Sequence, residues 1–373
     1  MTTVCCFGAY DVGYPRNRMV RAGLAAAGFG VVEARAEGKR AWRRWPALAA
    51  AWSRVAQRSD LVLVPEFRHK DVPLARALKG ARPLVFDPLV SRWDTLVEDW
   101  RLHPQGSAQA RWNRAIDRWS FRAADRLLCD TWAHGELFVE LGAERTRLRR
   151  VLVGAEPAFF EVAPPPEQGP VRLTYIGGFL PLHGIATLLE AVELLEARAS
   201  KLPPFVVQLV GDGIDHDEAR ATARKLGLTR VEFTGRMAYA DAPRVLASSH
   251  VALGAFGKGE KTGRVIPHKL WQGLAAGRAV VTGDGDGPRE VFTDGVHLKL
   301  VPRGDAARLA GWLGGSELPV DVRPGFPALT GVLVAQVDDA VAEGTGFDQL
   351  EIGSLGQSGK VGRPGAQDHR VDE

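Results

Sequence analysis

Cysteine and long apolar runs are scarce in this 373-residue chain. Its three cysteines, Cys5, Cys6 and Cys129, are an odd number, which favours free thiols over a disulfide framework. A bond between the adjacent Cys5 and Cys6 would have poor geometry. No run approaches the roughly 18 apolar residues of a membrane span, and no metal-ligand spacing or signal peptide is found. We therefore expect a cytoplasmic protein that needs neither cofactor nor metal.

Charge and tryptophan are distributed unevenly along the chain. Residues 1–150 hold 26 Lys and Arg against 16 Asp and Glu, and the remainder holds 22 against 28. Eight of the ten tryptophans lie in the basic part, most densely at 38–58 (GKRAWRRWPALAAAWSRVAQR). Two interpretations stay open. The segment is either a basic, aromatic surface that would hold the protein peripherally on anionic lipid, or a helix whose tryptophans pack inside. No nucleic-acid-binding module is recognised.

The second half of the chain alternates strands and helices. Strands are expected at 171–176, 205–210, 231–237 and 251–256, with helices between them. The first strand ends at Gly177 and Gly178, and the second at Gly211. Paired glycines before a helix let backbone N–H groups approach an anion. This alternation over 171–315 predicts a doubly wound parallel sheet.

Residues 256–284 combine cations with a helix start. Lys261, Arg264 and Lys269 precede or open a helix expected near 268–277, and a buried strand follows. A helix N-terminus and cations beside the carboxyl edge of a parallel sheet suit a diphosphate. The alternative is a solvated charge run before an ordinary amphipathic helix.

The first half of the chain predicts a second α/β unit. Polar residues follow its strands, at the edge where such sheets bind ligands. The candidates for catalysis are Asp11, Asp130 and His134, and those for acceptor binding are Arg16, Asn17 and Asp87. Each could instead be structural: the two aspartates as helix caps, and His134 as a surface helix residue.

Proline-rich and irregular segments divide the chain. The Pro-rich stretch 162–170 predicts a stiff linker between an N-terminal domain at 1–161 and a C-terminal domain at 171–315. The alternating pattern stops near Ser316. We expect residues 316–373 to be irregular and partly disordered, with one candidate helix at 332–344. This tail is either a divergent extension or the product of a lost reading frame.

The ordered motifs resemble glycosyltransferase family 4, the retaining enzymes of GT-B fold. They are GGFLPLHGI at 177–185, VGDG at 210–213, LGAFGKGEK at 253–261 and VIPHKLW at 265–271, with DVGYPRNR at 11–18. The resemblance covers roughly residues 1–315. It implies an α/β protein with two Rossmann-like domains facing a cleft. The donor side would comprise Gly177, Gly178, His183, Gly211, Lys261, Arg264, Lys269 and Gln272.

This chain departs from the family at two places. Gln272 stands where the family has the glutamate that holds the ribose, and Arg264 stands eight residues before it. Gly178 and His183 occupy the positions of an arginine and a lysine that face the diphosphate. Lys261, Arg264, Lys269 and backbone N–H groups would then neutralise the phosphates.

The sequence thus predicts a retaining glycosyltransferase with a nucleotide diphosphate sugar as donor. It would transfer a hexose-type sugar, without metal, to a glycan or lipid-linked acceptor, as in envelope or polysaccharide synthesis. Two alternatives remain: a non-catalytic sugar-nucleotide-binding protein of the same fold, and a sugar-nucleotide epimerase.

Overall fold

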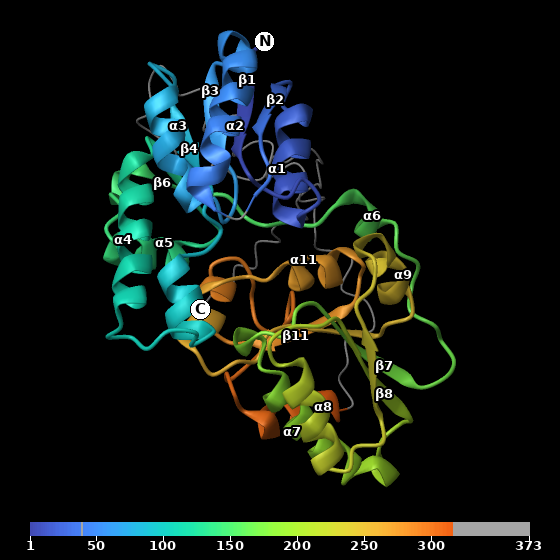
Figure 1. Ribbon diagram of the computed structural model, residues 1–373. Helices are drawn as coiled ribbons and strands as arrows, with labels where there is room; N and C mark the ends of the chain where they lie inside the picture. Colours follow the sequence, from blue (N-terminus) through green and yellow to red (C-terminus); the bar gives the residue numbers. More distant parts are fainter. Residues whose placement is uncertain (39, 316–373) are drawn as a thin grey trace, which may run out of the picture.

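The protein consists of two α/β domains that face each other (Figure 1). The computed structural model describes residues 1–38 and 40–315. The predictions for the tail from Ser316 onward, including the helix at 332–344, lie outside the described residues. Residues 162–170 carry neither helix nor strand and connect the two sheets.

The N-terminal sheet has six parallel strands in the order β2-β1-β3-β4-β5-β6. The strands are β1 (Thr3–Gly8), β2 (Gly30–Arg35), β3 (Leu61–Val64), β4 (Leu84–Phe86), β5 (Arg126–Cys129) and β6 (Leu148–Arg150). The helices are α1 (Pro15–Ala26), α2 (Ala41–Val55), α3 (Val72–Leu78), α4 (Ala108–Ala123), α5 (Trp132–Glu140) and α6 (Pro157–Phe160). A π-helix, η3 (Asp94–Asp99), follows β4.

The C-terminal sheet also has six parallel strands, in the order β12-β11-β10-β7-β8-β9. The strands are β7 (Val171–Ile176), β8 (Phe205–Val210), β9 (Val231–Gly235), β10 (Val251–Leu253), β11 (Ala279–Gly283) and β12 (Lys299–Val301). The helices are α7 (Ile185–Glu196), α8 (His216–Lys225), α9 (Ala242–Ala247), α10 (Glu260–Arg264), α11 (His268–Ala275), α12 (Asp286–Arg289) and α13 (Ala306–Leu313). Short 3₁₀ turns include η5 (Pro181–His183) and η7 (Tyr239–Asp241).

The inner strands of both sheets are buried because they are apolar on both faces. All four residues of β3 (LVLV) and all five of β11 (AVVTG) are buried. Near-continuous apolar strands of this kind are typical of parallel sheets covered by helices. The expected strand at 251–256 is shorter than predicted, since β10 ends at Leu253 and the chain turns at Gly254 toward the interdomain cleft.

A shared apolar cluster and several polar contacts join the domains. Val153 of the N-terminal domain lies in one core cluster with Trp271 of α11. The carboxylate of Glu290 accepts hydrogen bonds from the first two backbone N–H groups of α5, at Trp132 and Ala133 (2.8 and 2.7 Å). A carboxylate at a helix N-terminus is favoured by the helix dipole. The two sheets therefore hold their carboxyl edges toward one cleft.

The basic, tryptophan-rich segment at 38–58 mostly packs inward. It forms α2, where Trp52 is buried in the N-terminal core and Trp45 is partly buried against it. Arg44 is also buried and pairs with Asp71 at 2.6 Å. Trp42 alone among the segment's three tryptophans is largely exposed. The packing interpretation therefore accounts for most of this segment. In the part of the chain that is described, no helix is long and apolar enough to cross a membrane.

Candidate functional site

One large cavity of about 450 Å³ lies between the domains, at the carboxyl ends of both sheets. Its size is that of a small-molecule site. Two groups of residues line it, which we name the N-terminal wall and the C-terminal wall. The N-terminal wall consists of Tyr14, Pro15, Phe67, Leu89, Val90, Thr95, Asp99, Trp100, Asp130 and Val153. The C-terminal wall consists of Ile176, Gly177, Gly178, Leu180, Leu182, His183, Tyr239, Lys261, Val265, Ile266, Pro267, His268, Lys269 and Gln272.

The C-terminal wall begins with the glycine turn after β7. Gly177 has φ +147° and Gly211, after β8, has φ +136°. A Cβ atom on Gly211 would lie 1.9 Å from the carbonyl oxygen of Gly177. The two turns pack backbone to backbone, so Gly177 and Gly211 belong to one continuous surface. It lies beside the point where β7 and β10 adjoin and the strand order reverses, the usual place for a ligand in such sheets.

Lys269, in the first turn of α11, points at this turn. Its side chain is 92% buried, and its Nζ lies 3.9 Å from the centroid of the Tyr175 ring. Nζ has no hydrogen-bond partner. Burial lowers the pKa of this amine well below its usual value. A buried amine without an acceptor is costly, and an anion bound here would supply one.

His183, predicted to face the diphosphate, also lines the cavity, but it is not a cation. Its Nδ1 is 2.8 Å from the hydroxyl of Tyr175, and the carbonyl of Gly178 is a second neighbour of Nδ1. Burial, and then the nearby Lys269, lowers its pKa well below the usual range. The neutral ring therefore fixes the glycine turn, and the lysine alone is left to supply charge there.

Gln272 follows Lys269 by one helical turn and faces the same cavity. Its Nε2 donates a hydrogen bond to the hydroxyl of Tyr239 (2.7 Å). His268, at the start of α11, also lines the cavity, and its Nε2 has no partner. Burial lowers the pKa of His268 to about 3, so its ring is neutral. Gln272 is thus among the residues that line the cavity, and its contact with a ribose stays a prediction.

Lys261 and Arg264 differ from the sequence prediction, because both pair with the opposite domain. The Nζ of Lys261 donates to the hydroxyl of Thr95 (2.6 Å) and lies 3.4 Å from Asp94 and 3.6 Å from Asp99. Arg264 pairs with Asp94 at 2.7 Å. Lys261 still lines the cavity together with the glycine turn, and the role of both cations in neutralising the phosphates stays a prediction. The π-helix η3, which has no local signature in the sequence, supplies the acids.

Asp130 and His134 form a buried pair at the start of α5. Asp130 lines the cavity, and its Oδ1 lies 2.7 Å from Nδ1 of His134. His134 is fully buried, so the alternative that it is a surface residue is wrong. The hydroxyl of Thr131, not the Asp130 carboxylate, caps α5 by accepting from the N–H of His134 (3.0 Å). Asp130 is thus free to face a substrate, and His134 orients it from behind.

The other N-terminal candidates lie off the large cavity. Arg16 is fully buried, pairs with Asp87 (2.7 Å) and donates to the carbonyls of Val151 and Leu152, both 2.9 Å away. Asn17 donates to the carbonyl of Asp11 (2.6 Å).

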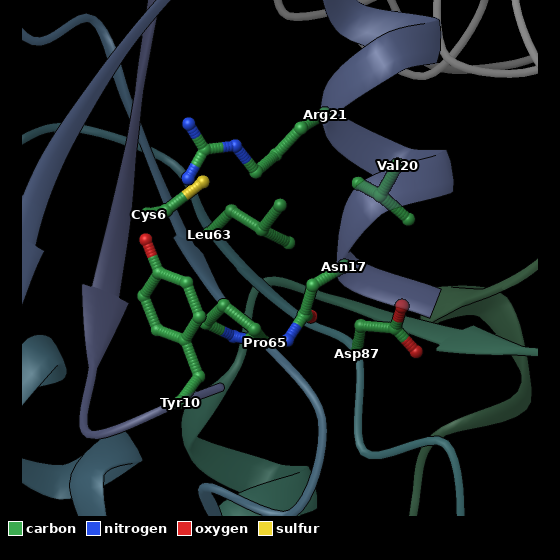
Figure 2. A pocket seen from close by; sticks show the side chains of 8 residues that line it. All are labelled: Cys6, Tyr10, Asn17, Val20, Arg21, Leu63, Pro65 and Asp87. Carbon is green, nitrogen blue, oxygen red and sulfur yellow. The ribbon is translucent and has the colours of Figure 1, made fainter. Parts of the chain in front are cut away.

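Asp11 is exposed, and its carboxylate accepts the N–H of Gly13 (2.8 Å). Figure 2 shows Asn17 and Asp87 around a separate cavity of about 10 Å³, room for about one water. Tyr10, Leu63 and Pro65 fill the space beside them. The geometry therefore assigns these candidates to the scaffold, because the N-terminal switch point between β1 and β3 is filled by side chains.

Most of the N-terminal wall, in contrast, escaped the sequence analysis because it is largely apolar. The exceptions are Asp130 and the two motif residues Tyr14 and Pro15. Phe67 and Leu89 have φ +60° and +58°, a left-handed conformation that bulky side chains rarely adopt. The N–H of Phe67 donates to the carbonyl of Pro88 (3.3 Å), which ties the two loops together. Phe67 also packs edge-on against Tyr14, with centroids 5.4 Å apart. Backbone strain of this kind clusters at functional sites. Strain is not visible in sequence, and no motif marked these positions.

The C-terminal domain matches a known family. Residues 170–313 match the sequence model described as glycosyl transferases group 1. This match covers the C-terminal part of the resemblance to glycosyltransferases predicted from the motifs, which extended over residues 1–315.

A curated relative also matches part of the chain. Phosphatidyl-myo-inositol mannosyltransferase of Mycolicibacterium smegmatis is 34% identical over 161 residues, which are 43% of this chain and 39% of the relative. The chain thus matches well under half the length of that relative.

Three solved structures share the fold at low identity. HepE of Anabaena in complex with UDP has a TM-score of 0.64 at 17% identity, covering 92% of this chain and all of the other. The same protein in complex with UDP-glucose gives 0.63 at 15%, with the same coverage. Sucrose-phosphate synthase of Thermosynechococcus elongatus gives 0.63 at 14%, covering 91% and 94%. The predicted fold of two Rossmann-like domains facing a cleft is therefore confirmed.

Proposed function

We propose that the protein is a retaining glycosyltransferase. It transfers a hexose-type sugar from a nucleotide diphosphate to a glycan or lipid-linked acceptor, without a metal ion. The observation that carries this proposal is the buried, unpartnered Nζ of Lys269 beside the Gly177–Gly178 turn. Retention of anomeric configuration, and a role in envelope or polysaccharide synthesis, follow from the family resemblance and form part of the proposal.

The donor diphosphate lies between the glycine turn and α11. The backbone of Gly177 and Gly178, the N-terminus of α11 and Lys269 provide its hydrogen bonds and charge. Gln272 and His268 then lie on the same helix face for the ribose. Solved relatives in complex with UDP and UDP-glucose, and a relative named as a mannosyltransferase, support a nucleotide-activated hexose.

Charge develops on the diphosphate as the sugar leaves. The bond between the sugar C1 and the phosphate oxygen breaks, and the acceptor oxygen bonds to C1 and gives its proton to an oxygen of the leaving diphosphate. The leaving diphosphate takes up the electron pair of the broken bond. Lys269 stabilises this charge without reorganising, since it is already held in place by Tyr175. Asp130, held by His134, orients a hydroxyl of the donor sugar or of the acceptor.

The acceptor lies on the N-terminal wall. This wall has an aromatic and aliphatic surface, formed by Tyr14, Phe67, Leu89, Val90 and Trp100. Asp130 is one of its polar groups. An apolar wall with few hydrogen-bonding groups favours an acceptor that carries an apolar portion beside the reacting hydroxyl. This surface supports a lipid-linked acceptor over a free polysaccharide.

A variant of Lys269 tests the proposal. We expect Lys269→Met to lower kcat/KM for sugar transfer about 100- to 1000-fold, the cost of losing one preorganised charge-stabilising group. The same variant should unfold at a higher temperature than wild type, because it replaces a buried, unpaired amine with an apolar chain of similar length. Transfer is followed with radiolabelled UDP- and GDP-sugars in the presence of EDTA, with extracted lipids or soluble glycans as acceptors.

Lys258→Met is the matched control, because Lys258 is exposed on the same domain. It should leave transfer within about twofold of wild type. Donor binding also draws a proton onto the Lys269 amine, so titration calorimetry in two buffers should show proton uptake that the Lys269→Met variant lacks. Unchanged transfer by Lys269→Met would overturn the proposal. Donor binding and proton uptake without any transfer would point to the non-catalytic alternative.

A further inference from the structure

The exposed face of α4 carries arginines and tryptophans and no acid. Its exposed residues are Ala108, Gln109, Arg111, Trp112, Arg114, Ala115, Arg118, Trp119 and Arg122. The one acidic residue of the helix, Asp117, is buried. The opposite face, with Ile116 and Phe121, packs into the domain. The helix therefore differs from an ordinary amphipathic helix, because its outward face combines aromatic side chains with several positive charges.

The two tryptophans of this face are far more exposed than is normal for their type. Trp112 is 61% exposed and Trp119 is 52% exposed. They are seven residues apart, so they lie on one side of the helix two turns from each other. Leu102, just before the helix, is 53% exposed as well. Large apolar side chains in water are costly, and tryptophan favours the boundary between water and an apolar phase.

Three arginines that flank the tryptophans make contacts within their own domain. Arg114 lies over the ring of Trp93 (5.5 Å), and Arg122 donates to the carbonyl of Gly142 (3.2 Å). Arg118 packs against Gly142. The nearest acid at the end of the helix, Asp125, already pairs with Arg76 (2.6 Å). The face keeps a net positive charge that nothing on the described part of the helix neutralises.

We propose that this α4 surface, defined by Arg111, Trp112, Arg114, Arg118, Trp119 and Arg122, docks on an anionic lipid bilayer. Its composition fits a helix lying in the plane of the membrane interface. The tryptophans enter the headgroup region, and the arginines meet lipid phosphates. A nucleic acid would also attract the charge, but two exposed tryptophans and Leu102 beside them favour an apolar phase. The surface does not depend on the proposed transfer reaction.

Docking there would place the cleft near the lipid. Asp117 of α4 accepts hydrogen bonds from the hydroxyl of Ser91 (2.7 Å) and from the backbone N–H of Trp93 (2.8 Å). These residues lead directly into η3, which contributes Thr95 and Asp99 to the cavity. The proposed membrane surface on α4 is therefore linked to the N-terminal wall through the hydrogen bonds of Asp117 and the start of η3.

The test compares three triple variants that each remove three positive charges. Sedimentation with vesicles of phosphatidylcholine containing about 30% phosphatidylglycerol measures binding. Arg114→Gln/Arg118→Gln/Arg122→Gln should weaken binding on the order of 100-fold, about fivefold for each arginine. The α2 triple variant, Arg43→Gln/Arg54→Gln/Arg58→Gln, changes two arginines of α2 and one of the 3₁₀ turn Ala56–Arg58 that follows it. This variant, and Arg220→Gln/Arg224→Gln/Lys225→Gln on α8, should change binding by less than about threefold.

A second pair of variants separates the aromatic contribution. Trp112→Ala/Trp119→Ala should weaken binding at least about tenfold, whereas the exposed Trp42→Ala should not. In wild type, brominated lipid should quench a part of the fluorescence that Trp112→Phe/Trp119→Phe lacks. Far-ultraviolet dichroism and thermal unfolding verify that each variant is folded.

Three outcomes would overturn the proposal. The first is equal loss of binding in the α2 and α4 triple variants. The second is wild-type binding to neutral vesicles that equals binding to anionic ones. The third is tighter binding of wild type to a single-stranded RNA than to anionic vesicles, with the α4 variant losing that binding.

Discussion

The two walls of the central cleft lie on similar six-stranded parallel sheets, yet they differ in the chemistry of the groups that face the cavity. The C-terminal wall is backbone and charge: a glycine turn, a helix N-terminus and Lys269. The N-terminal wall consists mainly of bulky apolar side chains on strained or irregular backbone, among them Phe67, Leu89 and Trp100. In the proposed function, one wall binds the phosphorylated donor and the other binds an acceptor with an apolar portion. Similar sheet edges can serve different ligands through their loops.

The walls also differ in how each switch point is used. In the C-terminal sheet the reversal beside β7 opens onto the large cavity through Gly177 and Gly178. In the N-terminal sheet the reversal beside β1 is filled by Tyr10, Asn17 and Pro65, which leaves space for about one water (Figure 2). The N-terminal ligand surface lies instead on the loops after β3 and β4. A filled switch point explains why Arg16 and Asn17 act as scaffold.

Replacing Gly211 should break the C-terminal wall and produce the largest effect. In Gly211→Ala the new Cβ would lie 1.9 Å from the Gly177 oxygen, in a left-handed backbone conformation. We expect the free energy of unfolding to fall by about 4 kcal/mol or more, and donor binding to be lost with the turn. Urea unfolding followed by dichroism measures it.

Gly259→Ala is the control for that substitution, since no atom lies within 4 Å of the position its Cβ would take. It should change stability by less than about 0.5 kcal/mol. A Gly211→Ala variant as stable as the control would mean that the packing of the two glycine turns does not support the wall.

The contrast between the walls also explains what could be predicted from the sequence. The strands, the GT-B fold and the cavity-facing positions of Lys269 and Gln272 follow from contiguous patterns, because glycine turns and helix starts are local. The pairing of Lys261 and Arg264 with Asp94 could not be predicted, since the partners are about 170 residues apart in sequence. The left-handed backbone at Phe67 and the burial of His134 likewise depend on distant neighbours.

A buried carboxyl under the N-terminal wall should make that wall's stability depend on pH. Burial, and then the nearby Asp87, raises the pKa of Glu66 to about 8. The folded state therefore holds a proton that the unfolded state loses near pH 4.5. Stability is then greatest below that pH and declines as the pH rises toward 8.

Glu66→Gln removes this decline. Compared with wild type, the variant should gain about 4 kcal/mol of unfolding free energy between pH 5 and pH 9. Glu140→Gln, at an exposed position on α5, should follow wild type throughout. Denaturant unfolding at a series of pH values measures the three curves. Parallel curves for wild type and Glu66→Gln would mean that Glu66 is ionised in the folded protein. A buried carboxylate would then lie beside the N-terminal wall.

Strain in the N-terminal wall should give the smallest change in stability and still affect function. Phe67 has φ +60°, and its ring is 37% exposed. Phe67→Gly loses part of a packed ring but relieves the left-handed backbone, so the net change should stay within about 1 kcal/mol. Phe67→Ala loses the same ring and keeps the strain, so it should be less stable than Phe67→Gly by about 1 kcal/mol.

Both variants should raise KM for an apolar acceptor about tenfold and leave the donor dissociation constant unchanged, because Phe67 lies on the opposite wall from Lys269. A rise in the donor dissociation constant equal to the rise in acceptor KM would show that the two walls do not bind separate substrates.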